Sequence, residues 1–362
     1  MKKILLEMKN ITKRFPGVVA LSNVNFQVAE GEIHCVVGEN GAGKSTLMKV
    51  LSGVYPHGQY QGEIIIDGEK QEFSNINDSK KTGIAIIYQE LALVPEMTVY
   101  ENIFLGHEIL NGISIDWNET IKRAEKELKK VRLQVNPAEK IKNLGVGKQQ
   151  LVEIAKALSM NVRLLLLDEP TSALSGDDSE NLLNLLRELK KQGVTCVLIS
   201  HKLSEVIKIA DSVTVLRDGE TVGLLSSEKE EITENALIKL MVGREINDIY
   251  PKRKSQKHNK VVFEVKDWNV YDPKLGKQIL SNINFNVKKG EIVGFAGLMG
   301  SGRTELVLSL FGNPARSRVS GDMYIDGEKN DFNHPENAIK EGLAYVSEDR
   351  KGNGLILIQD VK

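Results

Sequence analysis

The sequence predicts an α/β fold built on a buried, mostly parallel sheet, and it predicts that fold in two tandem copies. Short apolar runs, IHCVVG from Ile33 and RLLLLD from Arg163, are typical of buried parallel strands. Between the first run and the apolar-periodic LMKVLSGV lies a glycine-rich segment, GENGAGKST, which gives the order strand, loop, helix. The same pattern returns later in the chain at one constant offset.

An internal repeat defines the organisation of the chain. LSNVNF begins at Leu21 and LSNINF at Leu280, so the offset is 280 − 21 = 259. The same offset relates residues 31–33 to 290–292, Gly38, Gly41 and Gly43 to Gly297, Gly300 and Gly302, residues 67–69 to 326–328, and the run from Gly83 to the run from Gly342. We predict a first domain over residues 1–250, a linker over 251–260 (PKRKSQKHNK) and a second domain over 261–362.

The second copy is short. It offers 362 − 259 = 103 counterpart positions, so nothing in it corresponds to the first copy beyond Ile103. We expect the chain to be a fragment or a truncated gene product, with the second domain only partly ordered. We expect the strand before the glycine-rich loop to lie beside the strand ending at Asp168. Lacking that neighbour, the second copy should leave an apolar strand edge uncovered.

Composition and charge exclude several classes of protein. Apolar residues make up 41% and charged residues 27%, and the formal net charge is −1, as in an ordinary soluble globular protein. This near-neutral balance provides no broad positive surface for nucleic acid, and the basic linker is most simply a solvated one. Neither a signal peptide nor an apolar run of roughly 20 residues is found, so any work at a membrane requires docking onto another subunit. Cys35 and Cys196 lie in apolar runs and are predicted to be buried, reduced thiols.

The glycine-rich loop fits the phosphate-binding pattern G-x-x-x-x-G-K-[ST]. Its glycines let backbone N–H groups close around phosphate, and the following helix adds its positive end. Lys44 would reach the β- and γ-phosphates of a nucleotide, and Ser45 would bind Mg²⁺. A plain glycine turn is the alternative. The candidate nucleotide-binding residues of this loop are Gly38, Glu39, Asn40, Gly41, Ala42, Gly43, Lys44, Ser45 and Thr46.

Four further side chains lie at predicted strand ends, where α/β sheets bind their ligands. Asp168 suits coordination of Mg²⁺, and Glu169 is placed to polarise an attacking water. Gln89, in IIYQE, could bridge Mg²⁺ and that water, so Ser45, Gln89 and Asp168 are the candidate Mg²⁺ ligands. His201, in VLISHKLSEV, could contact the γ-phosphate, although an isolated histidine at such a place is usually structural.

The order of these motifs, with NLGVGKQQLVEIAKAL before LLLLDEP and SALS after it, resembles the ATP-binding subunits of ABC transporters. The resemblance covers the whole chain and implies P-loop NTPase domains of the ABC type, in tandem, with ATP and Mg²⁺ as cofactors. It implies that Phe15 stacks on adenine, that Glu169, His201 and Gln89 are catalytic, and that residues 172–175 form the D-loop. The implied signature motif, which contacts ATP bound to a partner domain, comprises Leu144, Gly145, Val146, Gly147 and Lys148, and continues to Gln150.

The resemblance also implies a subfamily and partners. Two fused copies, an arginine at position 303, and the segments GVYPHG and MVGRE are similar to ATP-binding proteins of monosaccharide importers, and most similar to those of xylose importers. The implied partners are a homodimer of membrane permease subunits, contacted through LVPEMTVYENIFLG, and an extracytoplasmic sugar-binding protein. The implied location is the cytoplasmic face of the cell membrane. No nucleic acid and no direct contact with sugar are expected.

The chain departs from the family pattern at several positions. Gly145 replaces a serine of the usual signature, and Lys148 replaces a glutamine. In the second copy Arg303 stands for the loop lysine and Glu348 for Gln89, while Thr304 keeps a hydroxyl. The second, degenerate loop therefore comprises Gly297, Gly300, Gly302, Arg303 and Thr304. Two alternatives remain: a fragment that binds ATP without turnover, and a soluble tandem ATPase acting on ribosomes or DNA.

Overall fold

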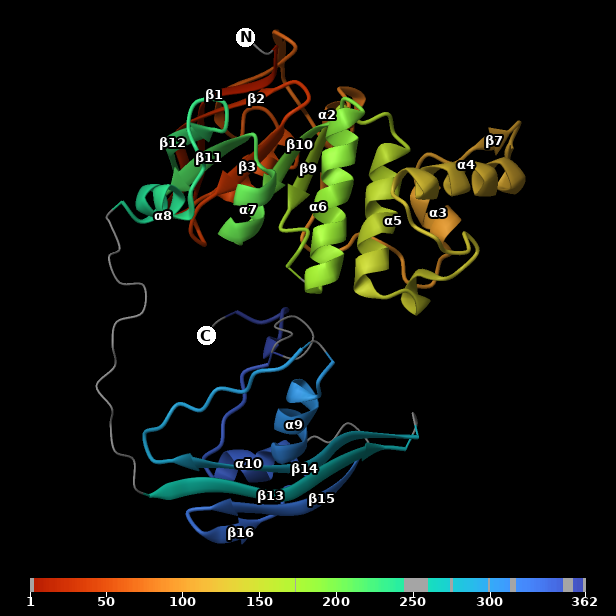
Figure 1. Ribbon diagram of the computed structural model, residues 1–362. Coiled ribbons are helices and arrows are strands. Elements are labelled where there is room, and N and C mark those ends of the chain that lie inside the picture. Colours follow the sequence, from red (N-terminus) through yellow and green to blue (C-terminus); the bar gives the residue numbers. More distant parts are fainter. Residues whose placement is uncertain are drawn as a thin grey trace. The chain divides into compact units, whose positions relative to one another are not determined.

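The chain divides into two compact units, Met1–Ile249 and Tyr250–Lys362 (Figure 1). The computed structural model describes residues 3–172, 174–243, 260–273, 276–298, 300–312, 317–347 and 354–360. Several predictions concern positions outside these ranges: most of the linker, the end of MVGRE, one D-loop residue and the acid at position 348.

Unit 1 contains two sheets with different strand patterns. The antiparallel sheet has the order β2-β1-β4-β5, with β1 Ile4–Phe15, β2 Val18–Ala29, β4 Gln61–Ile66 and β5 Glu69–Gln71. The larger sheet has the order β12-β11-β3-β10-β9-β6. Its strands are β3 Ile33–Val37, β6 Ile84–Ile87, β9 Leu164–Asp168, β10 Thr195–Ile199, β11 Ser212–Arg217 and β12 Glu220–Ser226. All its neighbours pair in parallel except β11 and β12, which confirms the predicted α/β fold with a mostly parallel sheet.

The prediction that the strand before the glycine-rich loop lies beside the strand ending at Asp168 is wrong. The strand that precedes the glycine-rich loop, β3, does not pair with β9, because β10 lies between them. Cys196 of β10 faces Ile33 on one side and Leu165 on the other. All five residues of β10 are buried. A run that is apolar on both faces can occupy the centre of a parallel sheet, where it pairs on both edges.

Helices surround the parallel sheet of unit 1 (Figure 1). They are α1 Lys44–Leu51, α2 Ile76–Lys81, α3 Val99–Phe104, α4 Trp117–Lys130, α5 Val146–Leu158, α6 Gly176–Lys191, α7 Leu203–Ile209 and α8 Glu234–Val242. A short hairpin, β7 Leu110–Asn111 and β8 Ser114–Ile115, precedes α4, and the 3₁₀ helix Ile141–Asn143 precedes α5. Helices α3, α4 and α5 contact one another and form a helical group beside the sheet. Within the described ranges, no helix is both long and apolar enough to span a bilayer.

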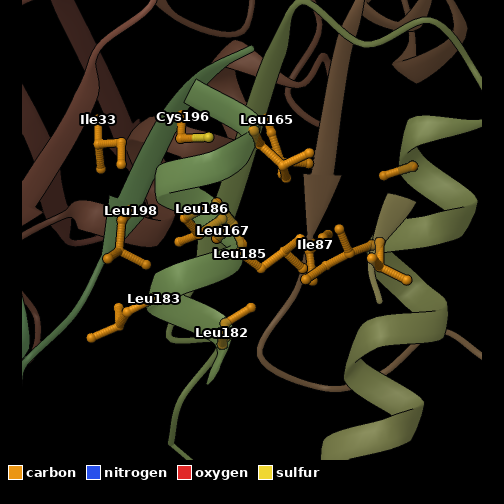
Figure 2. Packing of buried hydrophobic residues seen from close by; sticks show 14 of the residues in the cluster. Ile33, Ile87, Leu165, Leu167, Leu182, Leu183, Leu185, Leu186, Cys196 and Leu198 are labelled. Atoms are coloured by element: carbon orange, nitrogen blue, oxygen red, sulfur yellow. The ribbon is translucent and has the colours of Figure 1, made fainter. Parts of the chain in front are cut away.

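The core of unit 1 has two parts because side chains of a strand alternate between the faces of the sheet. Figure 2 shows the first part, in which Leu165 and Leu167 of β9 and Leu198 of β10 pack with leucines of α6. The residues in between, such as Leu166, belong to the second part, which lies against α1 and the antiparallel sheet. Both cysteines are buried and unbridged, as predicted, and burial raises the pKa of the Cys196 thiol to about 12.

Truncation of the α6 leucines should measure this packing. Leu186 is fully buried in the first part of the core. Leu186→Ala should lower the free energy of unfolding of unit 1 by about 2–5 kcal/mol, because a buried cavity replaces the side chain. Urea unfolding provides the measurement, and Leu224→Ala, at an exposed position of β12, is the matched control. A loss below about 1 kcal/mol for Leu186→Ala would contradict the described packing.

Unit 2 repeats the first part of unit 1. Its antiparallel sheet has the order β14-β13-β15-β16, with β13 Val261–Asp272, β14 Lys277–Lys288, β15 Arg318–Ile325 and β16 Glu328–Asn330. Its helices are α9 Arg303–Leu310 and α10 Pro335–Lys340. Shifting the bounds of β2, β5, α1 and α2 by 259 residues gives the bounds of β14, β16, α9 and α10 without any remainder. The repeat seen in the sequence therefore extends to the bounds of these four elements.

A parallel sheet is not among the described elements of unit 2. Ile292 is 83% exposed, whereas its counterpart Ile33 is 1% exposed. Val346 is 93% exposed, whereas its counterpart Ile87 is fully buried. Residues 291–298 form no strand, in contrast to β3 of unit 1. Within the described part of unit 2, the apolar run before the second loop is exposed and pairs with no strand, in contrast to β3.

Candidate nucleotide site

The loop between β3 and α1 has a backbone that only glycine adopts easily. Gly41 and Gly43 have φ values of 87° and 99°, in the left-handed region. Position 38 requires glycine for a different reason: an added Cβ would lie 2.3 Å from the carbonyl oxygen of Leu216. The sequence spacing of these glycines therefore reflects two left-handed residues and one close approach of backbone.

Helix α1 begins without a capping side chain. Gly43 is its N-cap, no side chain accepts from the first turn, and no acidic residue lies in that turn. The first N–H groups of a helix lack intrahelical partners, and the positive end of the helix dipole lies there. The start of α1 can therefore accept an anion such as a phosphate group, as the loop pattern predicted.

Lys44 is buried at the start of α1 and folds back over the loop. Its ammonium donates to the carbonyl oxygens of Gly38, at 2.9 Å, and Glu39, at 3.0 Å. Burial lowers the pKa of Lys44, and the carboxylates of Glu169 and Asp168 oppose that shift. The cation is thus held near two carboxylates and above the space that the loop encloses.

Asp168 ends β9 and is buried. Burial raises the pKa of its carboxyl group, and a hydrogen bond from Ser45 opposes the rise. The loop hydroxyl and the strand carboxylate therefore lie together, although 123 residues separate them in the chain (168 − 45). An oxygen-rich pair of this kind suits a hard cation such as Mg²⁺.

Glu169 contacts two other predicted site residues, Gln89 and His201. Its Oε2 accepts from Nε2 of Gln89 at 3.3 Å and lies 3.1 Å from Nδ1 of His201. Its own N–H donates to Ile199, and its φ of 49° is in the left-handed region, which is uncommon for a residue with a side chain. The imidazole is 51% exposed, so it is not a buried structural histidine. Gln89 and His201, from the ends of two strands, therefore converge on one oxygen atom of Glu169, which follows a third strand.

A second group of side chains was not predicted from the sequence. Thr171 donates through Oγ1 to Oε2 of Glu205 at 2.6 Å, and Lys202 donates to the carbonyl oxygen of Thr171 at 2.8 Å. Lys202 and Glu205 also pair at 3.2 Å. These contacts join the residue two positions after Glu169 to the start of α7. Lys202 and Glu205, which follow His201 in HKLSE, are the sequence feature from which these contacts could have been predicted.

The D-loop residues lie between β9 and α6. Ser172 is exposed, and its N–H donates to the carbonyl oxygen of Glu169. Ser175 caps α6 by accepting from the N–H of Asp178. The predicted signature segment lies near the same turn, since a Cβ added at Gly147 would come within 2.9 Å of the Asp178 carboxyl carbon.

The signature segment starts α5. Leu144 ends the 3₁₀ helix, Gly145 is the N-cap of α5 without a side-chain cap, and Val146 and Lys148 are exposed. Within the described residues, no hydrogen bond or ion pair connects residues 144–148 to the loop 38–46. The signature segment and the phosphate loop are therefore separate surfaces of unit 1.

Phe15 lies at the end of β1 and is half buried. The ring of Tyr55 meets its ring edge to face at 5.5 Å, and Nζ of Lys13 lies 5.0 Å from the Phe15 ring centre. Lys13 is also fixed by donating to the carbonyl oxygen of Gln59 at 2.8 Å. The ring is thus held by an aromatic neighbour and a cation.

The second loop shares two left-handed glycines with the first but has a different cation position. Gly300 and Gly302 have φ values of 78° and 88°, and a Cβ at Gly297 would meet the hydroxyl of Ser301. Arg303 and Thr304 are exposed, whereas Lys44 is buried. The left-handed conformation of two glycines is therefore shared by the two loops, and the burial of the cation is not.

Comparison with known proteins places this geometry in a family. A family model described as "ABC transporter" matches residues 21–172. The chain is 58% identical to the xylose import ATP-binding protein XylG of Thermoanaerobacter pseudethanolicus and 56% identical to the L-arabinose transport ATP-binding protein AraG of Geobacillus stearothermophilus. Each alignment covers 100% of this chain and 71% of the relative.

Solved structures agree with the sequence relatives. The ADP conformation of MJ1267, an ATP-binding cassette of an ABC transporter, has a TM-score of 0.58 and 26% identity, over 67% of this chain and 99% of the other. Dimeric MJ0796, a bacterial ABC transporter cassette, has a TM-score of 0.54 and 30% identity, over 61% of this chain and 98% of the other. This chain belongs to the family of ABC transporter ATP-binding proteins, which bind ATP and are ATPases.

Proposed function

We propose that this chain is the ATP-hydrolysing subunit of an importer of monosaccharides, and that the sugar is D-xylose. Four relatives named for xylose import or L-arabinose transport are 53–58% identical and are aligned over 100% of this chain. The observation that carries hydrolysis is the convergence of Gln89 and His201 on Oε2 of Glu169.

In the proposed reaction Glu169 orients the attacking water and accepts its proton. Gln89 now donates a hydrogen bond to Glu169 and His201 lies 3.1 Å from the same oxygen, so both must exchange that partner for the γ-phosphate or the water when ATP binds. Lys44 and the N–H groups at the start of α1 stabilise the negative charge on the phosphates. Phe15 stacks on the adenine ring.

The residues around the loop also fit Mg²⁺. Ser45 and Asp168 provide a hydroxyl and a buried carboxylate that already contact each other, and Gln89 can add an amide oxygen. Mg²⁺ is usually held by one or two carboxylates together with phosphate oxygens, and when bound it would neutralise part of the phosphate charge. We propose Ser45, Gln89 and Asp168 as its protein ligands.

We further propose two docking roles for unit 1. Residues 144–148 would complete a nucleotide site on a partner domain, since they are separate from the loop of their own unit and start a helix without a side-chain cap. Residues 93–106 would contact a permease homodimer at the cytoplasmic face of the membrane, which receives sugar from an extracytoplasmic binding protein. The division into residues 1–250, 251–260 and 261–362 belongs to the same proposal.

ATP binding without turnover is the second candidate function. It is favoured by unit 2, where Arg303 is exposed and residues 291–298 form no strand. Phosphate release by the whole chain decides between the candidates: release above the buffer rate supports hydrolysis, and ATP binding without release supports the second.

The sugar requires a separate experiment. The chain would be combined with its permease and binding protein in proteoliposomes loaded with ATP, and uptake of labelled D-xylose and L-arabinose compared. Preferential xylose uptake supports the proposal, whereas preferential arabinose uptake contradicts the choice of sugar and leaves the ATPase role intact.

A further inference from the structure

Helix α5 carries a carboxylate in an apolar setting. Glu153 lies in the middle of the helix and is buried, and its neighbours Val152, Ile154 and Ala155 are buried hydrophobic residues. Burial raises the pKa of Glu153, while a hydrogen bond from the N–H of Ala92 and the charge of Lys156 oppose the rise. Burying a carboxyl group lowers the stability of a fold more than burying an apolar side chain does, unless the carboxyl group is hydrogen-bonded. The hydrogen-bond partner of Glu153 therefore indicates what the residue does.

That partner is the segment that carries Gln89. Oε2 of Glu153 accepts the backbone N–H of Ala92 at 3.0 Å, and 61 residues separate the two in the chain. Residues 88–95 have no helix or strand of their own, so ladder hydrogen bonds do not hold them in place. Ala92 is only three residues from Gln89, whose amide reaches Glu169. A shift of the backbone at Ala92 would therefore move the Gln89 side chain.

The same segment has a second buried anchor. Asn102 of α3 is fully buried, accepts the N–H of Val94 at 2.7 Å and donates to the Val94 carbonyl oxygen at 3.1 Å. Two buried side chains from two helices thus hold alternate residues of one irregular segment. Beside it lies a cavity of about 210 Å³, lined in part by Tyr88, Ala92 and Glu153, so packing alone does not fix the segment on that side.

We infer that Glu153 is a positioning residue for Gln89: its hydrogen bond to the N–H of Ala92 holds the segment so that the Gln89 amide reaches Glu169. This inference rests on the proposed roles of Gln89 and Glu169. Glu153 lies on the helix that begins with the signature segment, seven residues after Val146. The bond therefore also ties the position of α5 to the position of Gln89.

The first test is hydrogen–deuterium exchange of the whole chain, read at the backbone amides of residues 89–94. Glu153→Ala should increase exchange at Ala92 on the order of tenfold, because the N–H loses its acceptor. Glu153→Gln retains an acceptor oxygen and should restore most of the protection. Glu125→Ala, at an exposed position of α4, is the matched control and should change nothing. Unchanged exchange in Glu153→Ala would overturn the inference, and this readout does not depend on turnover.

The second test is the kinetics of phosphate release. Glu153→Ala should lower kcat about 10- to 100-fold, as misplacement of a catalytic group does, and leave KM for ATP within about twofold. In a Gln89→Ala background, the added Glu153→Ala change should cause no further loss if Glu153 acts through Gln89. Full additivity of the two losses, or failure of Glu153→Gln to recover activity, would overturn the inference. If the unmodified chain releases phosphate no faster than a Glu169→Gln variant, the proposed function is contradicted. The hydrogen–deuterium exchange test would then decide whether Glu153 positions the segment.

Discussion

Glu169→Gln will slow phosphate release by about 10²–10⁴-fold and leave ATP binding intact. General-base catalysis contributes a factor of this size, and an amide cannot accept a proton from water at neutral pH. The glutamine has nearly the shape of glutamate, so it can still pair with Gln89 and His201, whose contacts with Oε2 are 3.3 and 3.1 Å. The positions of the loop and of Lys44 should therefore not change.

The measurement is single-turnover phosphate release, together with equilibrium titration of ATP. The matched control is Glu125→Gln, the same chemical change at an exposed position of α4. A carboxylate in a close ion pair would not serve, as at Asp211, which lies 2.6 Å from Lys190. Release at the rate of the unmodified chain would show that Glu169 is not the base. Loss of both binding and release would show that the carboxylate supports the fold of the loop instead.

Lys44→Ala will weaken ATP binding by roughly 10- to 100-fold. A hydrogen bond to a charged group contributes roughly 1.5–3 kcal/mol, and about 1.4 kcal/mol corresponds to a factor of ten. The change also removes the cation that lies near Asp168 and Glu169, so phosphate would approach two carboxylates whose charge is no longer opposed.

Lys44→Arg is the informative companion, because the second loop carries an arginine at the equivalent position. Lys44 is buried and donates to two loop carbonyl oxygens, whereas Arg303 is exposed. The planar guanidinium is larger than an ammonium and should not fit the enclosed position, so it should restore only part of the affinity. Calorimetric titration of ATP at fixed ionic strength measures both variants, with Lys81→Ala, an exposed lysine, as control. Full affinity in Lys44→Arg would show that charge alone matters.

Local chemistry explains why the loop could be predicted from the sequence. Gly41 and Gly43 occupy left-handed backbone, which is a local requirement for glycine. Gly38 differs, because its requirement comes from the distant Leu216 carbonyl oxygen. The apolar runs before the loop and before Asp168 form β3 and β9 for a local reason as well, since burial on both faces requires continuous apolar sequence. The chemical roles assigned to these residues stay predictions until the variants are measured.

The buried strands and the left-handed glycines of the loop could be predicted from the sequence, because strand pattern and backbone conformation depend on residues close together in the chain. The offset of 259 could be read directly from the repeated sequence. Only the tertiary structure decided that β10 separates β3 from β9, that Gln89 and His201 meet at Glu169, and that Glu153 holds Ala92. These contacts join residues from 31 (195 − 164) to 163 (196 − 33) positions apart, and the chosen pairing depends on the packing of the whole unit. A local pattern shows that a strand or a buried helix face will form, but the neighbour that it meets is selected by the combined burial of all elements.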